Sequence, residues 1–352
     1  MTTKGFMFQP LDLSQAAEDE YASLSEFKNK IHLEYSPDDP PIPLEEHKQG
    51  WKNIPSFVEY EAYIVWDSPK TDVIAYCEVA IYHTGDNEHA ADFTVEVLPE
   101  YRRQGIGQQG LRIITAFAQK HQRRLLITFA PDRIPASTHF LERLGARHGL
   151  EMHVNQLKLD EFDKSLVGLW LNQSNHLKAD YDLHLWDGPI PDEYIVEVAA
   201  VMQELANDQP RDDLEIEDMN FTPEMLRQNE KNMFARGNQR WFMYIIDKAN
   251  GKIAGLTEVV WNPNRGMILD QGFTAVLPEY RNKGMGRWLK AEMMQKILHE
   301  RPEVKFIRTR NANSNAPMLK INDEMGFKPY IANTIWQVET EKVEEYLAEK
   351  QL

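Results

Sequence analysis

The amino-acid sequence predicts an α/β protein of the α+β type, in which two tandem domains share one fold: a mixed, mostly antiparallel sheet flanked by helices. The first observation is a repeat, because Val-Leu-Pro-Glu-Tyr-Arg stands at residues 97–102 and again at residues 276–281. The second is that each copy enters an Arg-x-x-Gly-x-Gly turn, between a run of strand formers and a stretch of helical periodicity. The third is the length of 352 residues, enough for two domains that each bury a core.

The first half begins with a predicted strand at residues 4–13, and Asp12 or Ser14 would cap the helix that follows to about residue 34. The later elements of this half are a helix at 44–52, strands at 59–66, 73–82 and 93–98, the helix after the glycine turn, a strand at 124–129, a helix at 135–144 and a strand at 152–159. Residues 160–179 have apolar side chains at helical spacing and predict a connecting helix.

The second half repeats this order. Its predicted elements are strands at 181–186, 240–247, 253–261, 268–277, 304–309 and 334–338, and helices at 192–206, after Thr222-Pro223, after the second turn and at 316–324. The helix after the second turn should bury Met285, Leu289, Met293 and Ile297, which lie four residues apart. We therefore expect an N-terminal domain at 1–160, a connecting helix at 161–179 and a C-terminal domain at 180–352.

Both glycine turns predict a phosphate site. A turn of this kind directs consecutive backbone N–H groups and the positive end of a helix at one point, and glycine permits φ > 0 and close approach of an anion. Residues 105–110 also match the Gly-x-Gly-x-x-Gly dinucleotide fingerprint. However, residues 99–103 separate them from the preceding strand, and residues 125–127 are apolar where an acidic residue is expected. No nicotinamide cofactor is expected.

The motif Val-x-Pro-x-Tyr-Arg-x-x-Gly-x-Gly resembles the central acyl-CoA motif of the GNAT superfamily of N-acetyltransferases, and residues 315–327, ending Met-Gly-Phe, resemble the rest of that signature. The resemblance covers both halves and implies a tandem two-domain form, similar to mycothiol synthase-like proteins, with acetyl-CoA as co-substrate. The cofactor-binding residues that it implies are Thr274, Ala275, Val276, Arg281, Asn282, Lys283, Gly284, Met285, Gly286, Arg287 and Asn315 in the second domain, and Val95, Glu96, Val97, Arg103, Gln104, Gly105, Ile106, Gly107 and Gln108 in the first.

The resemblance also implies where catalytic groups should lie. A general base often stands eleven positions before the motif arginine, which is Asp270 here, and Glu258 on the preceding strand is the alternative. A partly desolvated Asp270 would have a raised pKa. The family's proton-donating tyrosine corresponds to Asn322, so Tyr330 or a water would have to replace it, or the thiolate would leave unprotonated.

The first domain lacks these groups and is expected not to be catalytic. The positions that correspond to Asp270, Asn315 and Asn322 are Ala91, Ile134 and Leu141. Two function classes remain: an acetyl-CoA-dependent N-acetyltransferase that acts on a primary amine in the C-terminal domain, or a non-catalytic CoA-binding or interaction protein. The residues at 270 and 315 favour the first class, and Asn322 favours the second.

Composition limits the partners. A net charge of −16 argues against a basic nucleic-acid-binding face. The N-terminal residues lack a secretion-signal pattern, and no apolar run reaches the roughly 18 residues of a membrane span, so we expect a cytoplasmic protein. Cys77 is the only cysteine and belongs to an apolar run, which predicts a core residue and no intrachain disulfide. No metal is expected.

Acidic residues gather between the first two strands of the second half. They are Asp208, Asp212, Asp213, Glu215, Glu217 and Asp218. In this architecture the stretch at 191–237 should build the acceptor pocket, where such carboxylates would attract a small amine with a second positive charge or an amine of a basic peptide. The alternative is an acidic loop that only contacts solvent.

Overall fold

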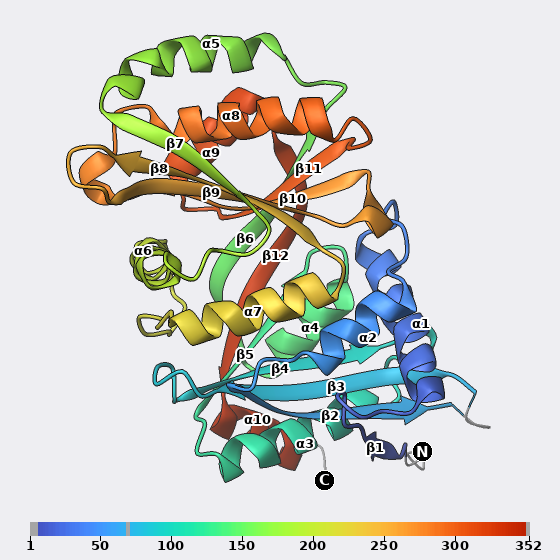
Figure 1. Cartoon of the computed structure of the whole chain (residues 1–352). Coiled ribbons are helices and arrows are strands. Elements are labelled where there is room, and N and C mark those ends of the chain that lie inside the picture. The colour runs from blue at the N-terminus through green and yellow to red at the C-terminus, as the bar shows by residue number, and fades with distance from the viewer. Residues whose placement is uncertain (1–5, 68–70, 350–352) are drawn as a thin grey trace. The chain divides into compact units, whose positions relative to one another are not determined.

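The computed structural model describes residues 6–67 and 71–349 and contains two compact units (Figure 1). Unit 1 comprises the described residues up to Glu151, Arg211–Asn220 and those from Ile331 onward, and unit 2 comprises Met152–Pro210 and Phe221–Tyr330. This division differs from the expected one, because the end of the chain returns to unit 1. Strand pairing is the reason: residues 333–339 pair with residues 125–131 of unit 1, and residues 152–158 pair with residues 306–312 of unit 2.

Unit 1 has its strands in the order β1-β2-β3-β4-β5-β12, and all neighbours are antiparallel except the parallel pair β4 and β5. The strands are β1 (Phe8–Pro10), β2 (Val58–Trp66), β3 (Val73–Tyr82), β4 (Ala90–Val97), β5 (Leu125–Pro131) and β12 (Lys328–Glu339). The helices are α1 (Glu18–Tyr35), α2 (Leu44–Lys52), α3 (Ile106–Lys120), α4 (Pro135–Arg143) and α10 (Thr340–Glu349). Helix α10, which was not predicted, packs on α3.

Unit 2 repeats this plan in the order β6-β11-β10-β9-β8-β7, with β10 and β11 as the parallel pair. Its strands are β6 (Arg147–Lys158), β7 (Tyr181–Asp187), β8 (Gln239–Asp247), β9 (Ile253–Trp261), β10 (Ile268–Val276) and β11 (Phe306–Ala312). Its helices are α5 (Ser165–Ser174), α6 (Ile195–Asn207), α7 (Pro223–Ala235), α8 (Met285–Glu300) and α9 (Ala316–Met325). Helices α8 and α5 cover one face of the sheet and α6 covers the other (Figure 1). Two domains of the expected mixed sheet, each flanked by helices, are thus present.

Local signals account for several of these elements. The predicted stripe of α8 is buried, since Met285, Leu289, Met293 and Ile297 are all at most 2% exposed. Thr222 caps α7 by accepting a hydrogen bond from the Met225 N–H at 3.2 Å, as its sequence context predicts. The start of α1 was predicted wrongly, because neither Asp12 nor Ser14 is its cap. Asp12 instead accepts from the Ser14 N–H, and α1 begins at Glu18.

Candidate active site

The two glycine turns have the same backbone conformation. In unit 1 the φ angles of Arg103 and Gly105 are +63° and +87°, and in unit 2 those of Asn282 and Gly284 are +62° and +90°. A Cβ atom built on either glycine would meet nothing within 4 Å, so glycine is needed here for its left-handed conformation and not for space. Helices α3 and α8 begin directly after these glycines, which leaves their first N–H groups directed out of the helix N-terminus.

The arginine that opens each turn holds the turn itself. The Nε atoms of Arg102 and Arg281 each donate a hydrogen bond of 2.9 Å to the carbonyl oxygen five residues earlier, and both guanidinium groups pair with a carboxylate, of Glu34 and Asp208 respectively. In unit 2, Lys283 donates to the Tyr181 hydroxyl at 3.1 Å. Backbone N–H groups are therefore the groups that these turns offer to a phosphate.

Each sheet opens at its parallel pair. In unit 2 the pairing of β10 with β11 covers only Ile268 to Gln271, although β10 continues to Val276. In unit 1 the corresponding pairing of β4 with β5 covers only Ala90 to Asp92. We call the unpaired region of unit 2 beyond Gln271 the strand divergence. It lies just before the second glycine turn and includes the backbone at 274–276 that was expected to bind acetyl-CoA.

A β-bulge distinguishes the two units. In unit 2 the register of β10 with β9 shifts between Gln271 and Thr274, so that Gly272 and Phe273 both oppose Glu258. A Cβ atom on Gly272 would lie 2.7 Å from a Glu258 carboxylate oxygen, so only glycine lets the carboxylate approach this closely. In unit 1 the equivalent register of β3 with β4 runs without a shift from Ala75 to Ala80.

Glu258 has the properties of a general base. Burial raises the pKa of its carboxyl group above the ordinary value, while the Arg240 charge and a hydrogen bond from the Phe273 N–H partly oppose that rise. Glu258 lies in one cross-strand row with Phe242 and Trp186, on the face of the sheet away from α8. An acceptor amine on that face would reach Glu258 beside the bulge.

The other two predicted catalytic residues lie on the same side of β10 and β11. Asp270 is exposed, which contradicts the expected desolvation, and it pairs in register with Val260 and Arg308. Its position immediately before the last paired residue of β10 leaves it on the face of Glu258. Tyr330 contacts the Arg308 guanidinium, which lies 4.4 Å from the ring centroid.

The two asparagines of the signature have different surroundings. Asn315 caps α9, where its Oδ1 accepts from the Met318 N–H at 3.4 Å. Asn322 is 1% exposed and accepts a hydrogen bond of 2.9 Å from Lys290. Sequence reasoning missed Lys290. The repeat contained the signal, because alignment of the two turns places this lysine opposite the buried Leu111.

The equivalent site in unit 1 is filled by side chains of its own. Glu78, which corresponds to Glu258, contacts the Tyr76 hydroxyl. The Lys28 ammonium lies 3.7 Å from the centroid of the Tyr76 ring and 2.6 Å from the Glu96 carboxylate. An internal ammonium group thus lies where an acceptor amine would have to enter, beside the strand that was expected to bind pantetheine.

Most of the acidic stretch belongs to unit 1, whereas Asp208 belongs to unit 2 and pairs with Arg281. Residues 211–220 belong to unit 1, where Glu215 pairs with Arg124 and Arg147 and its backbone N–H donates to Gln337 at 2.9 Å. No local pattern indicates that the connection between α6 and α7 forms part of unit 1. The steering of a cationic amine toward Asp270 stays a prediction.

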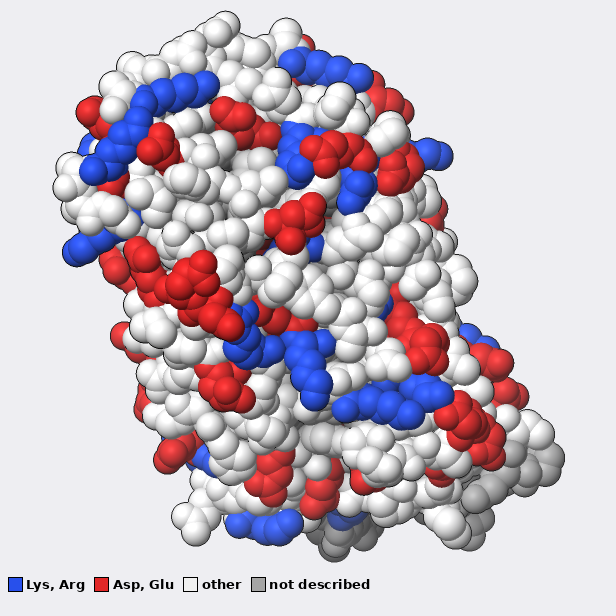
Figure 2. All heavy atoms as spheres, in the orientation of Figure 1, with Lys and Arg blue, Asp and Glu red and all other residues white. Residues whose placement is uncertain are grey.

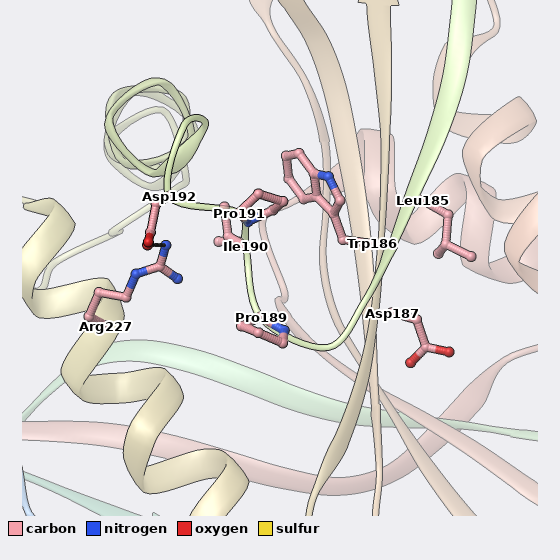
Figure 3. Close-up of a pocket in the computed structure, with 8 residues that line it drawn as sticks. All are labelled: Leu185, Trp186, Asp187, Pro189, Ile190, Pro191, Asp192 and Arg227. Atoms are coloured by element: carbon pink, nitrogen blue, oxygen red, sulfur yellow. Dashed lines mark hydrogen bonds and ion pairs between the residues drawn. The ribbon is translucent and has the colours of Figure 1, made fainter.

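A hollow of about 520 Å³ lies at the edge strand β7 of unit 2, between the end of β7, the loop at 189–192 and Arg227 of α7. Figure 3 shows the Trp186 side chain on the same side of β7 as Pro191, and Leu185 and Asp187 on the other side. Asp192 and Arg227 form an ion pair of 2.6 Å at its edge. Trp186 also stacks on Tyr244, with ring centroids 4.0 Å apart, and the wall of the hollow combines apolar residues with the charged residues Asp187, Asp192 and Arg227.

On the face shown in Figure 2, acidic and basic side chains are interspersed in small groups. Within residues 6–67 and 71–349, no three His, Cys, Asp or Glu side chains are grouped so as to hold a metal ion. In the same part of the chain, none of the helices is long and apolar enough to cross a membrane.

A strand, a left-handed glycine turn and a helix that together present backbone N–H groups beside diverging parallel strands define an acyl-CoA-binding α/β unit, which occurs twice here. The chain belongs to the acetyltransferase (GNAT) family, whose model matches residues 24–146 and 200–327. The expected family, its tandem form and an N-acetyltransferase enzyme are thereby confirmed. The family uses acetyl-CoA as co-substrate and acts on amine acceptors.

Solved structures show the same fold. A tandem GNAT protein from the clavulanic acid biosynthesis pathway matches with a TM-score of 0.74 at 24% identity, over 96% of this chain and 99% of that one. A GCN5-related N-acetyltransferase from Sphaerobacter thermophilus matches with a TM-score of 0.65 at 13% identity, over 95% and 96% of the two chains. No curated protein matches this sequence significantly.

Proposed function

We propose that the protein transfers an acetyl group from acetyl-CoA to a primary amine and that the reaction takes place in unit 2. The observation that carries this proposal is the bulge at Gly272 and Phe273, which places the Glu258 carboxylate beside the strand divergence. The glycine turn at residues 281–286 supplies backbone N–H groups for the pyrophosphate. The proposed pyrophosphate site at residues 281–286 and the proposed base Glu258 thus lie near opposite ends of the segment of β10 that follows the bulge.

Each requirement of the reaction has a candidate group in unit 2. From Thr274 to Val276 β10 pairs again with β9, but beyond Gln271 it has no pairing with β11, so a backbone N–H on that side can polarise the thioester carbonyl. The amine nitrogen then bonds to the carbonyl carbon, and Glu258 takes its proton, directly or through a water. The raised pKa of Glu258 makes it a better base than an exposed carboxylate.

Asp270 is the second candidate base, because it lies on the same face as Glu258. Asp270 is exposed, whereas Glu258 is partly buried beside the bulge. We assign Asp270 to the approach of the amine, and Tyr330 to the neighbouring surface beside Arg308. Comparison of Asp270→Asn with Glu258→Gln tests this order, since the base variant should lose more of its kcat.

Unit 1 is proposed to bind an anion without catalysis. Its turn has the conformation of the second turn, and a hollow of about 350 Å³ beside it is lined by Arg103, His139, Glu142 and Arg143. The unshifted β3–β4 register and the Lys28 ammonium at Glu96 count against transfer there. The two asparagine positions are apolar in unit 1. The bulge shifts the register by one residue, so that Asp92 and not Ala91 corresponds to Asp270, and Asp92 accepts a hydrogen bond of 3.0 Å from the Tyr82 hydroxyl.

The acceptor is proposed to bring its amine from the hollow at Trp186. Two strand spacings, about 10 Å, separate Trp186 from Glu258 along the row through Phe242. The Trp186 ring offers a stacking surface to a ring-containing group of the amine, and Asp187, Asp192 and Arg227 offer polar contacts. With most of the acidic stretch on unit 1, a second positive charge on the acceptor stays a prediction.

The decisive experiment follows acetyl-CoA with a panel of primary amines and detects both free thiol and the amide product. Glu258→Gln should lower kcat by about 10²- to 10⁴-fold, and Glu78→Gln, at the same position of unit 1, should leave it unchanged. Equal activity of both variants and the parent would contradict the assignment to unit 2. No amide from any amine would favour the alternative of a non-catalytic CoA-binding protein.

A further inference from the structure

Within the described part of the chain, the buried Lys290 of unit 2 has no carboxylate partner. Lys290, in the second turn of α8, is 1% exposed and is among the largest fully buried side chains of the protein. Its Nζ donates to Gln271 Oε1 at 2.8 Å and to Asn322 Oδ1 at 2.9 Å, and both acceptors are neutral amides. Lysines are almost never fully buried unless paired, so this residue is costly to the fold.

The two amides are oriented by further hydrogen bonds. The Asn322 Nδ2 donates to Asn311 Oδ1 at 2.8 Å, and the Gln271 Nε2 donates to the Thr274 hydroxyl at 3.2 Å. Their oxygens must therefore face Lys290, which donates to both whether its amine is charged or neutral. In the ammonium form Lys290 has a third N–H proton, in addition to the two that it donates to Gln271 and Asn322.

This network spans the strand divergence. Gln271 is the last residue of β10 that pairs with β11, and Thr274 is the first residue that pairs again with β9 after the bulge. On the other side, Asn311 lies near the end of β11 and Asn322 on α9. Lys290 thus connects both sides of the region where the strands separate, directly beneath the bulge that faces Glu258.

Unit 1 shows that the fold does not require this network. The residues that correspond to Lys290, Asn322, Thr257 and Thr274 are Leu111, Leu141, Cys77 and Val95. Leu111, Leu141 and Cys77 are buried core residues with 3% exposure or less. The same helix, turn and strands therefore form in unit 1 with apolar side chains. The polar network occurs only in the unit that also has the bulge.

Nearby charges do not account for the network. Arg287, one turn earlier on α8, is paired with Glu324 of α9 at 2.6 Å. Alternation along the strands places Glu258 of β9, Asp270 of β10 and Arg308 and Arg310 of β11 on the opposite face of the sheet. Helix α5, which packs on α8, has no charged residue. Burial lowers the pKa of Lys290 to about 7.

We propose that Lys290 is a positioning residue of the acyl-transfer site, an inference that rests on the proposed function. Lys290 fixes Gln271 and Asn322 across the strand divergence. As an ammonium group it also stabilises the departing CoA thiolate. In the transfer the amine nitrogen bonds to the carbonyl carbon, the C–S bond breaks with its electron pair on sulfur, and Glu258 takes the proton of the amine. The thiolate then takes a proton from water. Lys290 thus compensates for the absence of an acidic side chain at position 322.

The test uses CoA itself as a probe, so that it does not depend on turnover. In parent protein, Lys290→Met and Lys290→Gln, each saturated with CoA, the alkylation rate of the CoA thiol is measured against pH. The parent should show a thiol pKa lower than in both variants and alkylation about 5- to 10-fold faster at pH 7, because only the thiolate reacts. Leu111→Met, the matched change in unit 1, should behave as the parent does.

Kinetics give the second readout. Lys290→Met should lower kcat about 10- to 100-fold with little change in KM for acetyl-CoA, and should remove the decline in kcat above pH 7. An identical thiol pKa in the parent and both folded variants would overturn the proposal. A parent that shifts the thiol pKa but forms no amide would instead contradict only the proposed acyl transfer.

Discussion

Replacing Lys290 with methionine should change how the stability of unit 2 depends on pH. In the folded protein, burial lowers the pKa of Lys290 from 10.5 to about 7. The unfolded chain keeps the ordinary value, so between pH 7 and about 10 the unfolded state binds one proton more at this residue than the folded state. The free energy of unfolding therefore rises with pH in this window by about 1.4 kcal/mol per pH unit. Below pH 7 both states are protonated, and the dependence disappears.

The magnitude is worked over a narrow range, because other groups titrate at higher pH. Burial raises the pKa of Cys77 and of Tyr63 to about 12, which lowers stability once their unfolded counterparts ionise above about pH 8.5. From pH 7 to 8.5 the parent should gain roughly 1.5 to 2 kcal/mol that Lys290→Met does not gain. The absolute stability of the variant is less informative, because removal of the amine also leaves two amide oxygens without their donor.

Urea unfolding at several pH values, followed by tryptophan fluorescence, measures this difference. Five of the eight tryptophans lie in unit 2 and three in unit 1, so the signal reports on both units: Trp170, Trp186, Trp241, Trp261 and Trp288 in unit 2, and Trp51, Trp66 and Trp336 in unit 1. Leu111→Met serves as the control and should retain the slope of the parent. If parent and Lys290→Met had the same pH dependence, Lys290 would be protonated in the folded protein at pH 8.5, and the reasoning from its burial would be refuted.

Three further predictions concern single residues of unit 2. Gly284→Ala places a side chain at φ +90°, which lowers the free energy of unfolding by about 1 kcal/mol. The melting-temperature shift given by acetyl-CoA should therefore shrink. Gly168→Ala, in open space on α5, should preserve that shift. Since the folded pKa of Glu258 is raised, kcat should fall as the pH drops through a value above the usual carboxyl range, and a pH profile with its acid limb near 4.5 would contradict this. Thr222→Ala should lower the free energy of unfolding by about 1 kcal/mol, measured by urea denaturation, because the Met225 N–H loses its acceptor.

Much of the site could be predicted because its signals are local. The left-handed residues at Gly105 and Gly284 follow from the glycine spacing, and the Thr222 cap follows from a threonine before a proline. Asp270 was selected by its distance along the chain from Arg281, but distance along the chain does not report burial. The structure shows it exposed, and Glu258 beside the bulge instead has the raised pKa.

The sequence by itself determined the repeat, the two glycine turns and the apolar faces of the helices, because turn conformation and amphipathic periodicity depend on residues only a few positions apart. Only the tertiary structure decided that residues 331–349 complete unit 1, that residues 211–220 lie on it, and that β10 bulges while β4 does not. It also decided that Lys290 meets Gln271 and Asn322. These features depend on strand register and on contacts between distant segments, for which no short pattern exists, because a strand can pair with any partner whose apolar face fits the same core.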